Sequence, residues 1–148
     1  LRRLGLKYEV KAADAGQPGT WWDGRPFDAI LLDAPCTASG IVRRHPDVRW
    51  LRRASDVAQL AAIQRHLLDT LWPLLKPGGR LLYCTCSVFR AEGQDQVSAF
   101  LERHTDALAI PSVGHLRPGT VVVDREFNDN ESGGYDGFFY ARFDKALP

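Results

Sequence analysis

Methionine is absent from this sequence, even at the first position, and cysteine occurs only three times in 148 residues. The opening Leu1-Arg2-Arg3-Leu4-Gly5 resembles the end of a helix stopped by glycine, so we expect a piece of a longer protein. The cysteines are odd in number, and their spacing is not typical of a disulfide framework. This favours a reducing compartment, and we expect the cytoplasm. The sequence has no run of about eighteen apolar residues and no signal-peptide pattern, so no membrane partner is expected.

A strong net charge is also missing, because 19 basic residues face 18 acidic ones and the formal charge is +1. Bulk charge therefore neither favours nor excludes a nucleic-acid partner. Length and composition predict a single domain over residues 1–148. The basic residues are clustered, and such a cluster is either a solvated face or a binding site. It comprises Arg43, Arg44, Arg49, Arg52 and Arg53, with His45 and Trp50 among them.

Two short apolar runs organise the chain, and each ends in a polar turn that carries a cysteine. Phe27–Leu32 is followed by Asp33-Ala34-Pro35-Cys36, and Arg80–Cys84 is followed by Thr85-Cys86-Ser87. Their nearly continuous apolar character predicts strands covered on both faces of a parallel sheet. Ligands collect at the carboxyl ends of such strands, so we expect the two turns to form two walls of one site.

Two helices and three further strands complete the predicted α/β fold. An apolar stripe predicts a helix capped by Ser55 or Asp56 and closed near Pro73, and a second helix is expected over Ala91–His104. Alternation of strands and helices indicates a mostly parallel sheet. The other expected strands, of which the last two would pair as an antiparallel hairpin at a sheet edge, are Tyr8–Ala12, Thr120–Val123 and Phe138–Phe143.

The polar residues at the strand ends allow several chemistries. Cys86, at a strand end ahead of a helix, is a candidate nucleophile, although a cysteine at such a position is more often buried and inert. Asp14 and Asp33 each follow a strand, and each can cap a loop amide or contact a ligand. A zinc site is a distant alternative because the spacings are not those of a zinc finger. Its ligands would be Cys36, Cys84, Cys86 and His45.

Several motifs agree in order and spacing with one family over nearly the whole chain. They are Leu32-Asp33-Ala34-Pro35-Cys36, Gly40, Arg43-Arg44-His45-Pro46-Asp47, Trp50, Tyr83-Cys84-Thr85-Cys86-Ser87 and Asp136-Gly137-Phe138-Phe139-Tyr140-Ala141. In these motifs the chain resembles the RNA cytosine-carbon-5 methyltransferases, above all their RsmB (Sun/Fmu) branch, which methylates small-subunit ribosomal RNA. The resemblance implies a Rossmann-like fold, S-adenosylmethionine as cofactor, ribosomal RNA as partner and no metal. A monomer is expected.

The resemblance also implies roles for individual residues. Cys86 is expected to be the nucleophile that forms a covalent adduct with cytosine, and Cys36 to help release the product. Asp33 lies where the family contacts both cofactor and target base, and Asp14 where an aspartate lies near the adenine of the cofactor. Pro35 is expected to border the cofactor. The residues expected to contact RNA are Arg43, Arg44 and His45.

The family's glycine-rich cofactor loop and N-terminal RNA-binding region have no counterpart in this sequence and would lie before Leu1. We therefore expect the C-terminal portion of a catalytic domain, with an incomplete sheet, which is inactive by itself. Two alternatives stay open. One is an enzyme like the DNA cytosine-5 methyltransferases, in which Cys36 would be the nucleophile. The other is a non-catalytic RNA-binding module.

Overall fold

The computed structural model of the protein describes residues 2–5, 8–117 and 136–148. The described strands and helices follow one another as β1 (Phe27–Asp33), α1 (Val48–Leu51), α2 (Ala54–Leu71), β2 (Leu75–Thr85), α3 (Gln94–Arg103), β3 (Ala107–Leu116) and β4 (Phe138–Lys145). Short 3-10 turns lie at Arg2–Leu4, Pro18–Thr20, Ser39–Ile41, Trp72–Leu74 and Arg90–Glu92. No helix in these described ranges is long and apolar enough to cross a membrane.

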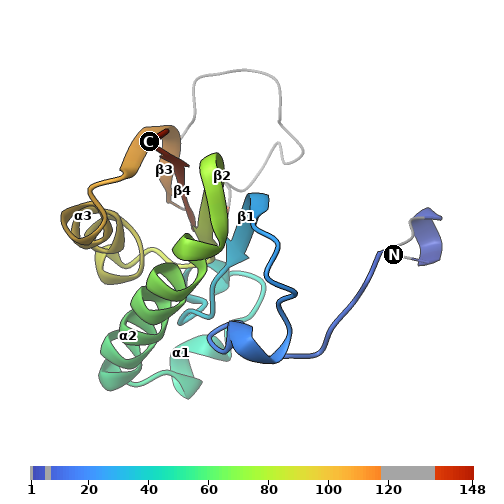
Figure 1. Ribbon diagram of the computed structural model, residues 1–148. Helices are drawn as coiled ribbons and strands as arrows, with labels where there is room; N and C mark the ends of the chain where they lie inside the picture. Colours follow the sequence, from blue (N-terminus) through green and yellow to red (C-terminus); the bar gives the residue numbers. More distant parts are fainter. Residues whose placement is uncertain (1, 6–7, 118–135) are drawn as a thin grey trace.

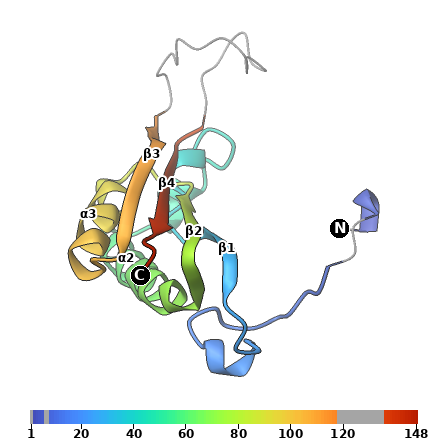
Figure 2. The ribbon, with the colours of Figure 1, turned by 45° about the horizontal axis from the view of Figure 1, so that its top comes forward.

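The described strands form one sheet in the order β1-β2-β4-β3 (Figure 2). β1 and β2 are parallel, whereas β2 with β4 and β3 with β4 are antiparallel. The predicted α/β class is confirmed. The described part of the sheet is mixed rather than mostly parallel, because a single helical crossover, through α2, joins parallel strands and the closing hairpin supplies both antiparallel pairings.

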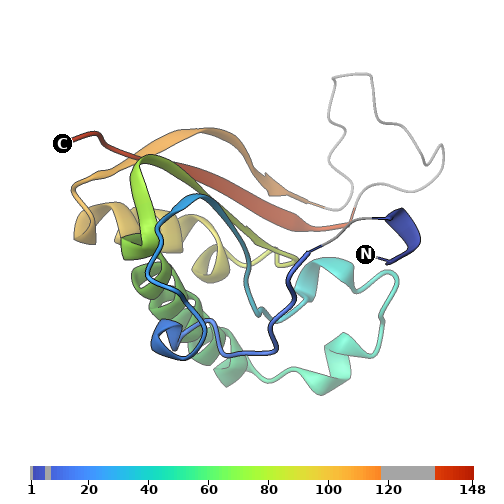
Figure 3. The same ribbon diagram turned by 45° about the vertical axis from the view of Figure 1, so that its right-hand side comes forward.

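Helices α2 and α3 lie on the same side of the sheet (Figure 1 and Figure 3). The core between them and the sheet contains large side chains that are almost fully buried, among them Leu68, Trp72, Leu81, Tyr83, Phe100, Phe139 and Phe143. No described element covers the opposite face at β1, where Leu31 is 68% exposed. The prediction that β1 and β2 are covered on both faces therefore holds for one face of the described sheet only.

The predicted helix before β2 is confirmed as α2. The Asp56 carboxylate accepts a hydrogen bond from the backbone N–H of Arg53 at 3.0 Å, which caps the first turn as expected. The helix ends at Leu71, and the next turn contains Pro73. The apolar stripe is only partly buried, since Ile63 is 46% exposed while Gln64 is fully buried.

One expected strand does not form, and one strand that does form was not predicted. Tyr8–Ala12 forms no strand: it is exposed, extends away from the sheet (Figure 1), and pairs with no described strand. A strand needs backbone partners, which this segment lacks in the described residues. β3, which was not expected, is the partner of β4. The sequence pattern did not predict β3 because it contains Pro111 and Gly114, which are uncommon inside strands. The pairing of β3 with β4 shifts between Ile110 and Gly114, where these residues lie.

The expected strand Thr120–Val123 lies outside the described residues. The expected strand Phe138–Phe143 is confirmed within β4, which pairs antiparallel with β2 on one side and with β3 on the other. Residues 76–79 form an irregularity inside β2. Pairing with β1 there jumps from Leu75 to Arg80, and Gly78 takes a φ of +74°.

Candidate active site

The turns after β1 and β2 meet, as expected for the same end of two parallel strands. The N–H of Ala34 donates to the carbonyl of Cys84 at 3.0 Å, and the N–H of Gly40 donates to the carbonyl of Cys86 at 2.9 Å. These bonds hold the turns side by side. The Sγ atoms of Cys36 and Cys86 are 3.3 Å apart, close enough to share one proton in a hydrogen bond.

The two thiols of this pair differ in acidity. The hydrogen bond from Cys36 lowers the pKa of Cys86 from 9.0 to about 7, against an opposing effect of burial and of the Asp33 charge. The same bond, together with burial, raises the pKa of Cys36. Cys86 is therefore the thiol that ionises first, and near neutral pH a substantial fraction of it is a thiolate stabilised by the Cys36 S–H.

The third cysteine is placed differently. Its Sγ donates weakly to a carboxylate oxygen of Asp33 and to the carbonyl of Leu32, both at 3.6 Å. Burial and the Asp33 charge raise the pKa of Cys84 to about 11, so it stays a neutral thiol. Within the described ranges no group of three or more histidine, cysteine or acidic side chains could hold a metal ion, so the zinc alternative has no support there.

A buried carboxylate connects the two cysteine turns. Glu92 is fully buried. It accepts hydrogen bonds from the backbone N–H and hydroxyl of Thr37 at 2.9 and 2.5 Å, and from the hydroxyl of Ser87 at 2.6 Å. Its fourth donor is the amide of Gln64 at 3.1 Å. Since Thr37 follows Cys36 directly and Ser87 follows Cys86, one carboxylate is bonded to the neighbour of each cysteine.

The surrounding polar groups extend this network. The amide of Gln64 also donates to the carbonyl of Pro35 at 2.8 Å, and the hydroxyl of Tyr83 donates to the carbonyl of Glu92 at 2.8 Å. The sequence prediction gave Glu92 and Gln64 no role. The polar Gln64 within an otherwise apolar helix face was the signal that a buried polar group faced the site.

The start of β4 closes the site from a third direction. Gly137 donates its N–H to the carbonyl of Gly40 at 2.7 Å, and a Cβ added at Gly40 would lie 1.8 Å from the Gly137 carbonyl oxygen. Only glycine fits at Gly40. The adjacent Asp136 carboxylate is almost fully buried and forms ion pairs with Arg44 and, at 3.6 Å, with Arg43. Two of the expected RNA contacts therefore have a carboxylate partner inside the chain.

The remaining candidates lie at the edge of the site. Asp33 is exposed at the end of β1. Asp14 is not beside it in any described contact, and its carboxylate accepts from the N–H of Gly16 at 2.8 Å and from the amide of Gln17 at 3.1 Å. His45 is exposed. The structure thus brings Cys36 and Cys86 into contact and leaves Asp33 close enough for its charge to affect Cys86. The printed partners of the Asp14 carboxylate are Gly16 and Gln17.

The same fold occurs in solved structures that are much longer than this chain. The crystal structure of PH0851 matches 97% of this chain and 32% of its own with a TM-score of 0.79 and 31% identity. A methyltransferase homologue from Pyrococcus horikoshii matches 97% of this chain and 47% of its own with a TM-score of 0.71 and 28% identity. With the cysteine pair at the carboxyl end of its parallel strands, the chain has the α/β fold of the methyltransferases.

Comparison of the sequence narrows this class. The chain belongs to the family described as 16S rRNA methyltransferase RsmB/F, whose model matches residues 1–144. It is 48% identical over 145 residues to the ribosomal RNA small subunit methyltransferase B of Erwinia tasmaniensis, and 49% identical over 145 residues to that of Vibrio cholerae. Each match covers 98% of this chain but 32% of the relative, so the chain spans about a third of their length.

Proposed function

We propose that the protein containing this chain transfers a methyl group from S-adenosylmethionine to carbon 5 of a cytosine in small-subunit ribosomal RNA. Family membership supports the general reaction. The observation that carries the finer proposal is the contact between the sulfurs of Cys36 and Cys86 at 3.3 Å, in which Cys86 is the more acidic thiol. Such a pair suits covalent catalysis, in which one thiol attacks and a second assists its departure.

The residues act in a definite order in this proposal. The Cys86 thiolate adds to carbon 6 of cytosine, which makes carbon 5 nucleophilic. After carbon 5 has taken the methyl group, a base removes its proton, the bond between carbon 6 and sulfur breaks, and aromaticity returns. Cys36 assists this last step by donating a hydrogen bond to the departing thiolate. Asp33 is exposed at the end of β1, where its charge affects Cys86, and is proposed to contact the cytosine ring.

The residues at the end of β1 fit part of a site for S-adenosylmethionine, which supplies the methyl group when bound. Asp33 and Pro35 are exposed at the carboxyl edge of the parallel pair, where α/β sheets bind ligands. The open face at Leu31 offers apolar surface beside them. Asp14 is proposed to reach the adenine end. The remaining part of this site would come from chain beyond the 148 residues, which would also continue the sheet beside β1.

The proposed partner is ribosomal RNA, the proposed location is the cytoplasm, and the enzyme is proposed to act as a monomer. His45 and the basic side chains of Arg43 and Arg44 remain proposed RNA contacts. Because Asp136 neutralises one of the two guanidinium charges, this cluster keeps less positive charge for phosphates than its sequence suggests.

An RNA containing 5-fluorocytosine at the target position tests the proposed function in the whole protein. Fluorine at carbon 5 cannot leave as a proton, so the adduct is trapped after methyl transfer. We expect a protein–RNA band on a denaturing gel that requires S-adenosylmethionine. A whole protein that binds the RNA but forms no such band at any cytosine would refute the covalent reaction and leave an RNA-binding module.

Adduct formation is expected to depend on pH through Cys86. Because the pKa of Cys86 is lowered to about 7, the thiolate fraction and the initial rate should rise as pH increases through 7 and level off above it. In Cys36→Ala the stabilising S–H is gone, so the midpoint should move upward toward the ordinary thiol value of 9.0. The rate at which iodoacetamide alkylates Cys86, measured across pH, gives the midpoint for each protein. Identical midpoints in both proteins would contradict this account of the pair.

A further inference from the structure

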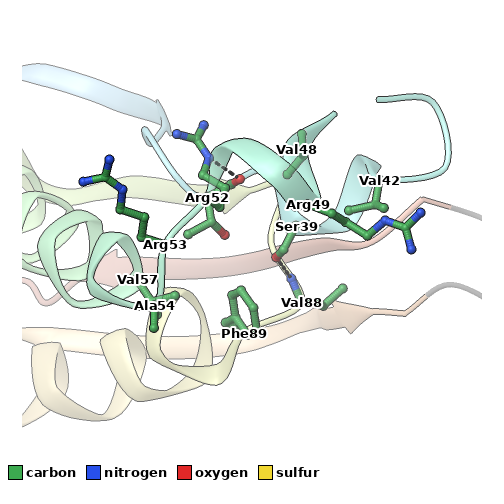
Figure 4. A pocket seen from close by; sticks show the side chains of 11 residues that line it. Ser39, Val42, Val48, Arg49, Arg52, Arg53, Ala54, Val57, Val88 and Phe89 are labelled. Atoms are coloured by element: carbon green, nitrogen blue, oxygen red, sulfur yellow. Dashed lines mark hydrogen bonds between the residues drawn. The ribbon is translucent and has the colours of Figure 1, made fainter. Parts of the chain in front are cut away.

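A pocket of about 400 Å³ lies beside the cysteine turns, on residues that the proposed mechanism does not use (Figure 4). Thr37 and Ser39 of the turn after β1 line it, as do Val88 and Phe89 of the turn after β2. Val42 and the segment from α1 to the start of α2 provide the remaining wall, and the lining residues of that segment are Val48, Arg49, Arg52, Arg53, Ala54 and Val57. We call this hollow the arginine pocket. Its volume lies in the range of small-ligand sites.

The interior of the arginine pocket is apolar and includes an accessible ring. The side chains of Val42, Val48, Val57 and Val88 are half-buried, and Phe89 is 43% exposed. An exposed phenylalanine beside valines is a surface on which a flat, weakly polar group can stack. A nucleobase has this character once it has left its own stack.

The rim of the arginine pocket is positively charged, and not all of its arginine side chains bond to other groups of the described chain. Figure 4 shows Arg53 and Arg49 on opposite sides of the hollow, with their guanidinium groups extending outward. Arg52 donates to the carbonyl of Thr37 at 2.9 Å, which holds its side chain against the turn. Neither Arg49 nor Arg53 forms a side-chain ion pair with any acidic group in the described part of the chain. Two arginine side chains without an ion-pair partner among the described residues therefore flank the apolar interior.

We propose that the arginine pocket binds one unstacked base of the RNA strand next to the target cytosine, with Phe89 as its stacking surface. A nucleotide within a strand has one phosphate on each side of its sugar, which matches cations on opposite sides of an apolar hollow. Thr37 directly follows Cys36, and Val88 is separated from Cys86 by one residue, so the bound base would be close along the strand to the reacting cytosine. This inference rests on the proposed function, because it assumes that RNA is the substrate.

The test measures RNA affinity by fluorescence anisotropy in the whole protein carrying Cys86→Ala, so that no chemistry contributes. Phe89→Ala is expected to weaken binding about ten-fold, the effect of losing one base–aromatic stack. Arg49→Gln with Arg53→Gln should lower the slope of log affinity against log salt by about two contacts. Arg65→Gln, an exposed arginine elsewhere on α2, is the matched control and should leave the slope nearly unchanged.

Shortened RNAs identify the bound base. One RNA ends at the target cytosine on its 3′ side and another on its 5′ side. For the RNA that lacks the stacked base, Phe89→Ala should change affinity by less than two-fold. An equal loss of affinity for every RNA, or no loss for any, would overturn the proposal. A lowered melting temperature with unchanged RNA affinity would also overturn it and assign the pocket to the protein's own chain. Failure of the wild type to form the 5-fluorocytosine adduct would instead refute the proposed reaction, because this binding assay needs no catalysis.

Discussion

Replacement of Cys86 by alanine in the whole protein is expected to lower methyl transfer by about 10⁴-fold or more, because no other described thiol can take its place. Burial still raises the pKa of Cys36 when the Cys86 thiol is absent, and the pKa of Cys84 is raised to about 11. Cys36→Ala should instead affect release of the adduct, and this is seen with RNA that contains ordinary cytosine. The adduct should form but leave slowly, so that a covalent protein–RNA band accumulates on a denaturing gel.

Cys84→Ala provides the matched control, since it removes a thiol from the same strand end without touching the Cys36–Cys86 contact. It should form and release the adduct as the wild type does. If instead the adduct disappears in Cys36→Ala and persists in Cys86→Ala, the assignment is reversed, and the arrangement of the DNA cytosine-5 methyltransferases describes the site.

The second large effect is expected at Glu92. Glu92→Ala leaves the N–H and hydroxyl of Thr37, the hydroxyl of Ser87 and one Gln64 amide bond without their acceptor in a buried space. Each unpaired buried donor costs roughly 1–3 kcal/mol, so we expect the free energy of unfolding to fall by at least about 3 kcal/mol. Urea titration of the whole protein measures the change.

Glu92→Gln separates positioning from stability. It keeps the shape and one acceptor oxygen but directs an NH₂ group at hydroxyls that donated to the carboxylate, so we expect a smaller loss of stability. The folded variant should still form the 5-fluorocytosine adduct more slowly, because the turns that carry Cys36 and Cys86 lose part of their common anchor. Glu102→Ala, an exposed glutamate on α3, is the control. Equal urea midpoints for the alanine variants at Glu92 and Glu102 would rule out the anchoring role.

The sequence correctly predicts the features that depend on residues close together in the chain. The apolar runs predicted β1 and the regular part of β2, and the cysteine turns meet at one end of the parallel pair because α/β topology requires it. It was insufficient for Glu92, whose burial depends on Thr37, 55 residues away, and on Gln64, 28 residues away. The sequence also did not predict β3, because Pro111 and Gly114 are untypical of strands. Pairing with β4 stabilises this strand despite them.

The same limit explains Tyr8–Ala12, whose sequence suits a strand but which has no neighbour among the described strands. Strand propensity acts only when another backbone offers hydrogen bonds. It also explains the arginine cluster, whose sequence could not reveal that Arg43 and Arg44 meet Asp136 while Arg49 and Arg53 border the pocket.

The two edges of the described sheet differ in how well they resist aggregation. β3 carries Pro111, which lacks an N–H, and its irregular pairing near Gly114 makes it a poor template for another strand. β1 pairs evenly from Ala29 to Asp33 on its inner side, and no described strand occupies its outer side, next to the exposed Leu31. An unpaired, regular strand edge beside an exposed apolar side chain is a template for pairing with another chain. We therefore expect aggregation of these 148 residues in isolation to begin at the outer side of β1 and not at β3.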